Sequence, residues 1–163
     1  MYPLEHDELA FEIGEALVAA GAKVAVAETT AGGLISARML SVPASSRWFE
    51  RGVIVYTGTA RRDLIEPDVE ILRTHGAVSR EAVVDMVERL RAKAGVEYAV
   101  GESGIAGPQG SRRSPKPVGS VVIAVAGPAR TTVEEHVFPG SRAQVMMHIA
   151  ERSLEMLREA ISS

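Results

Sequence analysis

The sequence predicts an α/β fold: a three-layer α/β/α sandwich around a mixed, mostly parallel sheet of about five to six strands. Two observations support this prediction. Short apolar runs alternate with longer stretches whose apolar residues recur at helical spacing, and glycines or hydroxyl residues stand at the boundaries. Strands separated by helices of this length form a sheet that helices cover on both faces. No internal repeat or linker divides the chain, so we expect residues 1–163 to form a single domain.

The amino-terminal part begins with a helix. Residues 9–20 carry an apolar stripe at helical spacing, and the stripe stops at Gly21, a residue that adopts the left-handed helix-end conformation at little cost. The short apolar run at 23–28 predicts a buried strand. The hydroxyl-rich and glycine-rich segment 29–33 predicts a turn, and residues 34–40 predict the helix that leaves it.

The middle of the chain continues the alternation. A second strand is predicted at 53–56, and two short helical pieces at 60–65 and 69–73 follow it. Ser79 is placed to cap a longer amphipathic helix that ends near Gly95.

The carboxyl-terminal part predicts three more strands and a final helix. The strands lie at 98–100, 119–126 and 130–138, and the last two form a hairpin-like pair that adds an antiparallel edge. Ser141 opens the last helix.

Three turns are candidates for a binding site: 29–33, 45–52 and 103–110. In α/β folds of this kind, ligands gather where strands end and helices begin, because loops and helix amino termini present backbone N–H donors there. The first turn offers the hydroxyls of Thr29 and Thr30, which suit a phosphate or a carboxylate. Tight packing is an equally good explanation for its Gly-Gly pair.

Composition excludes several classes of protein. Cysteine is absent, which removes thiolate catalysis, disulfides and cysteine-bound zinc, and no histidine has metal-ligand spacing. A net charge of −3 argues against a nucleic-acid surface. No apolar run approaches the roughly 20 residues that span a bilayer, and the acidic start of the chain is unlike a signal peptide. We expect a cytoplasmic protein that needs no metal or cofactor and binds no membrane.

Several short motifs occur in a specific order along the chain: Ala27-Glu28, Gly32-Gly33-Leu34, Ser45-Ser46, Trp48-Phe49, Arg51-Gly52, Tyr56, His75-Gly76-Ala77-Val78-Ser79 and Ser103 to Pro108. With them the chain resembles the carboxy-terminal domain of the competence/damage-inducible protein CinA, a domain that also occurs alone as nicotinamide mononucleotide amidohydrolase. The resemblance covers nearly the whole chain and implies the stand-alone form. It further implies hydrolysis of a pyridine-nucleotide carboxamide to the acid and ammonia, a reaction of NAD salvage.

The resemblance also implies roles for three catalytic residues. Family enzymes are described as Ser/Lys amidohydrolases, in which the serine that matches Ser46 attacks the carboxamide with assistance from the tyrosine that matches Tyr56. The position of the lysine base is occupied by Arg61. A guanidinium stays protonated at physiological pH, so Arg61 can hold a phosphate or orient Tyr56 but cannot accept the proton. We therefore expect weakened activity.

Substrate-binding positions follow from the same resemblance: Thr29, Thr30, Gly32, Gly33, Ser103, Gly104 and Arg142. Thr29 replaces the usual serine of the family's first turn, and Ala31 replaces its usual threonine. For Arg142, an exposed charge at the start of a helix is the alternative explanation. Lys116 and His75 are alternative bases, although a structural role is the better explanation for both.

Three functions are therefore open at this stage. The first is an amidohydrolase, and the second is a non-catalytic protein that keeps the pocket and a small nucleotide-like ligand but has lost the base. The third, an interaction protein in DNA uptake, is suggested by the family name alone and conflicts with the charge balance. The sequence leaves assembly into a homo-oligomer open.

Overall fold

The computed structural model describes residues 5–108 and 115–163 and has the predicted α/β architecture. Residues 109 and 110 of the third candidate turn lie outside the described part. Five strands form one sheet in the order β2-β1-β3-β4-β5. Their bounds are β1 Val24–Glu28, β2 Phe49–Ile54, β3 Tyr98–Gly104, β4 Ser120–Ala126 and β5 Thr131–Val137.

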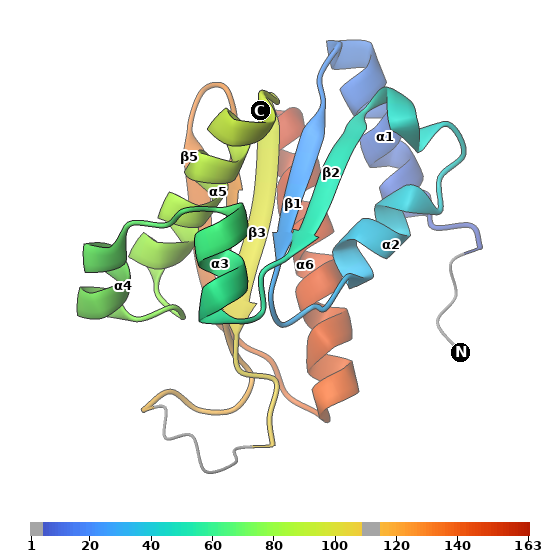
Figure 1. Ribbon diagram of the computed structural model, residues 1–163. Coiled ribbons are helices and arrows are strands. Elements are labelled where there is room, and N and C mark those ends of the chain that lie inside the picture. The colour runs from blue at the N-terminus through green and yellow to red at the C-terminus, as the bar shows by residue number, and fades with distance from the viewer. Residues whose placement is uncertain (1–4, 109–114) are drawn as a thin grey trace.

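The sheet is mixed. β1 pairs in parallel with β2 and with β3, whereas β4 is antiparallel to β3 and to β5. The carboxyl ends of β1, β2 and β3 therefore lie at one edge of the sheet, which we call the carboxyl edge (Figure 1). Their amino ends lie at the opposite edge, the amino edge.

Helices cover both faces. On one face, α1 (Glu8–Ala20), α2 (Leu34–Leu40) and α6 (Arg142–Ile161) pack together, and on the other lie α3 (Gly58–Leu64), α4 (Val69–His75) and α5 (Arg80–Ala94) (Figure 1). Two buried clusters separate these layers, one on each side of the sheet. The expected three-layer sandwich is confirmed.

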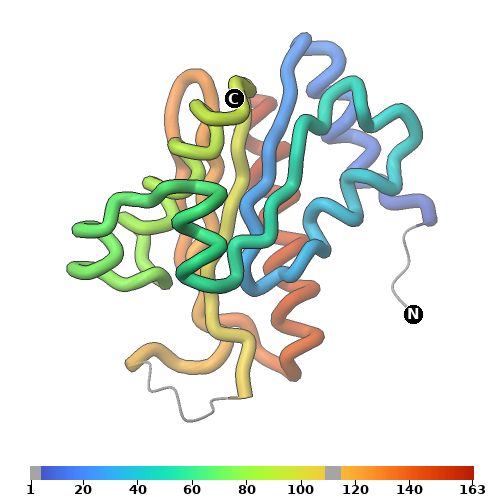
Figure 2. The backbone as a smooth tube through the Cα atoms, in the orientation of Figure 1, coloured from blue at the N-terminus to red at the C-terminus, as the bar shows by residue number. Residues whose placement is uncertain are grey.

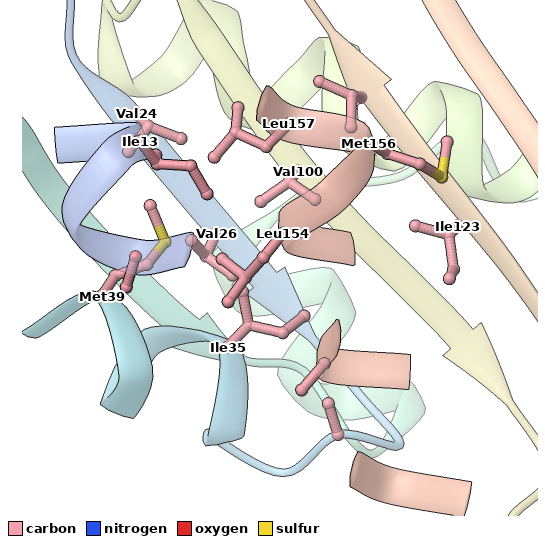
Figure 3. Close-up of a cluster of buried hydrophobic side chains, with 14 of the residues drawn as sticks. Ile13, Val24, Val26, Ile35, Met39, Val100, Ile123, Leu154, Met156 and Leu157 are labelled. Carbon is pink, nitrogen blue, oxygen red and sulfur yellow. The ribbon is translucent and has the colours of Figure 1, made fainter. Parts of the chain in front are cut away.

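The larger cluster fills the space between the sheet and α1, α2 and α6. Ile13, Val26 and Leu154 meet there with no exposed surface (Figure 3). All five residues of β1 and the first six of β3 are buried, and two of them are charged: Glu28 and Glu102, each with 0% exposure. Burying a carboxylate costs free energy unless it is hydrogen-bonded, so the burial of both side chains must be explained by their hydrogen-bond partners.

β2 differs from its prediction. It begins at Phe49 rather than Val53 and forms an edge strand, with Glu50, Arg51 and Gly52 exposed. An exposed edge strand lacks the apolar pattern by which buried strands are recognised, so the residues before Val53 resembled a loop.

Candidate functional site

A cleft of about 730 Å³ opens at the carboxyl edge. Its walls come from the end of β1, the segment between β2 and α3, the end of β3 and the start of α6. Beyond β3 the backbone at residues 105–108 extends past the strand ends before β4 returns (Figure 2). The cleft brings together seven of the ten predicted site residues: Thr29, Thr30, Tyr56, Arg61, Ser103, Gly104 and Arg142.

Two arginines stand in its walls. Arg61 lies on α3, whose amino end is capped by Thr57, and its Nη2 is 3.4 Å from the Ser103 hydroxyl oxygen. Arg142 is the first residue of α6; its Nη1 donates to the Gly107 carbonyl at 2.8 Å, and its Nη2 lies 3.4 Å from the Tyr56 phenol oxygen. Two guanidinium groups in one concave site suit a phosphate or carboxylate ligand.

Ser46 is not in this cleft. It lies exposed on the short 3-10 helix η1 (Ser45–Arg47), directly before the amino end of β2, whereas Tyr56 follows the carboxyl end of that strand. The six residues of β2 span about 20 Å at roughly 3.3 Å per residue. The prediction that Ser46 shares one cleft with Tyr56, Arg61 and Ser103 is therefore wrong for a single chain, because a segment that precedes a parallel strand lies at the amino edge.

Gly32 and Gly33 are also outside the lining of the cleft. Gly33 has a positive φ of 103° at the start of α2, and its N–H donates to Glu28 at 2.9 Å. The Gly33 donor is thus occupied by the protein's own carboxylate, and substrate binding through Gly32 and Gly33 stays a prediction.

Glu28 is surrounded by donors from the first turn of α2. Its Oε2 accepts N–H bonds from Gly33 at 2.9 Å and Ile35 at 3.1 Å, and its Oε1 accepts the N–H and hydroxyl of Ser36 at 2.9 and 2.6 Å. Gly52 of β2 leaves the space that Ser36 occupies, because a Cβ there would meet its oxygen at 2.2 Å. Glu28 thus caps α2, where the helix dipole favours negative charge.

Glu102 extends the register of β3 beside Glu28 and points to the same face of the sheet. Its Oε1 accepts the N–H groups of Thr29 at 2.6 Å and Ala31 at 2.9 Å. Its Oε2 faces the Thr29 hydroxyl oxygen at 3.4 Å. Burial, reinforced by the charge of Glu28, raises the pKa of Glu102 to about 7; the N–H groups of Ala31 and Thr29 and the Thr30 hydroxyl act in the opposite direction.

The hydroxyls of Thr29 and Thr30 connect Glu102 to the cleft. Their oxygens are 3.2 Å apart, and the Thr29 hydroxyl also lies 3.0 Å from the Glu102 carbonyl oxygen. Both threonines line the cleft although neither exposes more than 5% of its surface. Glu102 was missed from sequence; the available signal was a carboxylate inside an otherwise uncharged, buried strand.

Lys116 makes structural contacts beside the cleft. Its ammonium donates to the Val78 carbonyl at 2.6 Å and lies 3.8 Å from Glu135. Across residues 5–108 and 115–163, the structure groups no three His, Cys, Asp or Glu side chains that could hold a metal ion. In the same ranges, no helix has the length and apolar character to cross a bilayer.

Comparison with known proteins identifies the family. The model of the CinA C-terminal domain matches residues 6–161. The chain belongs to this family. Its solved members include the competence damage-inducible protein A of Klebsiella pneumoniae, with a TM-score of 0.90 and 29% identity over 95% of this chain and 96% of that one. The protein CihA of Agrobacterium tumefaciens gives a TM-score of 0.88 at 32% identity, covering 100% and 99% of the two chains.

Relatives within the CinA family differ in length. The chain is 39% identical to a CinA-like protein of Acidobacterium capsulatum over 86% of its own length but 34% of that protein, so it spans about a third of such relatives. A second relative matches end to end: the nicotinamide-nucleotide amidohydrolase PncC of Enterobacter agglomerans, 39% identical over 96% of both chains.

Proposed function

We propose that this chain is an amidohydrolase that releases ammonia from the carboxamide of a pyridine mononucleotide, at a reduced rate. The similarity to the amidohydrolase of Enterobacter agglomerans over 96% of both chains carries this proposal. The cleft supports it: about 730 Å³ lies within the range of small-ligand sites. Arg61 and Arg142 suit the phosphate; the Ser103 hydroxyl lies 3.4 Å from Arg61, and Thr29 lines the same cleft.

The reduced rate follows from Arg61. If the family's lysine accepts the proton of the nucleophile, an arginine at its position removes that function, because a guanidinium does not deprotonate at physiological pH. The same substitution supports the second candidate, a protein that binds the nucleotide without turnover.

One experiment separates the two functions. Purified protein is incubated with nicotinamide mononucleotide, and ammonia is measured alongside the binding isotherm from calorimetry. Binding with slow ammonia release supports the amidohydrolase; binding with no release at any pH between 6 and 9 supports the non-catalytic protein. Absence of binding contradicts both, because both require the cleft to hold the nucleotide.

A further inference from the structure

Glu102 has surroundings that a structural carboxylate does not need. Its Oε1 is satisfied by two N–H groups, but its Oε2 has the Thr29 hydroxyl as a neighbour at 3.4 Å. No cation is placed against it among the contacts of the described residues. A buried carboxylate in such a site is ready to accept a proton, because neutralisation removes the cost of burying its charge.

We propose that Glu102 is the proton acceptor of the cleft and that it takes its proton from the Thr29 hydroxyl. This inference rests on the proposed amidohydrolase function and supplies the base that Arg61 cannot be. Thr29 lines the cleft, and its hydroxyl lies 3.0 Å from the Glu102 carbonyl oxygen and 3.4 Å from Oε2 of the Glu102 carboxylate. The neighbouring Thr30 also lines the cleft, and its hydroxyl interacts with Glu102 as well. Catalytic hydrogen bonds in ligand-free sites are often long and shorten when the substrate binds, which accommodates the 3.4 Å separation.

The reaction balances with these two groups. As the Thr29 oxygen bonds to the carboxamide carbon, its proton moves to Glu102 Oε2. The same proton passes to the amide nitrogen when the carbon–nitrogen bond breaks, and ammonia leaves. Water then attacks the resulting ester and gives a proton to Glu102. Thr29 recovers that proton when the ester bond breaks and the acid is released.

Charged groups around Glu102 set the pH dependence of this step. Glu28 faces it from β1 and disfavours its ionised form, while Arg61 from α3 and Arg142 from α6 line the same cleft as Thr29. A base must be ionised to act. With a Glu102 pKa of about 7, the rate should rise with pH through neutrality and then level off.

The decisive variants are Glu102→Gln, Thr29→Val and Thr29→Ser. Kinetics of ammonia release from nicotinamide mononucleotide are measured from pH 5.5 to 9. We expect Glu102→Gln to lower kcat by about 10²- to 10⁴-fold, as loss of a base does, with KM little changed and the rise near neutrality lost. Thr29→Val should behave alike, whereas Thr29→Ser should keep the rise because it keeps the hydroxyl.

A second readout does not depend on turnover. In protein with carbon-13-labelled glutamate carboxyl groups, one NMR resonance should titrate near pH 7 and be missing in Glu102→Gln. An active wild type whose Glu102→Gln variant keeps its rate and pH profile overturns this inference and leaves the proposed function intact. A wild type that binds the nucleotide but never releases ammonia overturns the hydrolase itself, and the base with it. If Glu102→Gln does not fold, the Thr29→Val and Thr29→Ser pair decides the question.

Discussion

Glu28 and Glu102 are the same residue type, equally buried, on neighbouring parallel strands and on the same face of the sheet. Their partners differ. Glu28 accepts four hydrogen bonds, two on each oxygen, from the start of α2. Glu102 accepts two N–H bonds on one oxygen and faces a cleft hydroxyl with the other. The difference indicates that depth alone does not fix the role of a buried carboxylate; the number of donors around each oxygen does.

The largest expected effect is a difference in stability between two single variants, Glu28→Gln and Glu102→Gln. In Glu28→Gln, an amide NH₂ must face N–H or O–H donors at either oxygen position, so the free energy of unfolding should fall by about 3 kcal/mol. In Glu102→Gln, the amide can donate to the Thr29 hydroxyl, which retains acceptor capacity, so the loss should stay below about 1 kcal/mol. Urea unfolding at pH 6 measures both. Equal losses would contradict the distinction between the two sites.

The second effect is a pH dependence of stability. The Glu102 pKa rises from 4.5 to about 7 on folding, so the folded state holds more protons than the unfolded state between these values. Its contribution to stability is fully present below pH 4.5 and is lost as the pH rises through 7. Relative to Glu102→Gln, the wild type should lose about 1 kcal/mol per pH unit in this window. Parallel stability curves for the two proteins would show that Glu102 does not titrate there.

Most of the fold could be predicted from the sequence because its signals are local. Gly21 and Gly95 end α1 and α5 in the left-handed conformation, and Ser79 and Ser141 cap α5 and α6 as expected. The start of β2 could not be predicted, because an edge strand with exposed charges carries no apolar alternation.

Part of the site could also be predicted, because the positions of strand ends are local signals. Tyr56, Arg61 and Ser103 follow or terminate strands, and the rule for carboxyl edges brings them together. The position of Ser46 was predicted wrongly because the predicted strand began at Val53. Residues 45–52 were therefore taken for a site turn, whereas Ser46 precedes the amino end of β2. The sequence marked Glu102 only as a carboxylate inside a buried strand. Its contact with Thr29, 73 positions away, depends on strand pairing, so the surroundings of Glu102 could not be predicted.

A smaller effect is expected when a second base is placed in the cleft at position 61, beside Ser103. Arg61→Lys introduces an amine that can lose its proton if burial lowers its pKa. Ammonia release should rise, but by less than about 10²-fold, the lower end of what a positioned base contributes, because Glu102 already accepts protons. The comparison is made in the Glu102→Gln background as well, where the relative gain should be larger. No gain in either background would mean that an amine at this position cannot act as the base.

The smallest expected effect is that of Ser46→Ala. Ser46 lies at the amino edge, separated from Tyr56 by the whole of β2, so a chain acting alone should release ammonia at the wild-type rate. Stability should also change little, because the side chain is exposed. A large loss of rate with the fold intact would require Ser46 to act in the cleft of a second copy of the chain. Mixing Ser46→Ala with Glu102→Gln tests that outcome directly. If the two inactive variants regain activity together, residues of two subunits form one site. A mixture that is no more active than its components would exclude such a shared site.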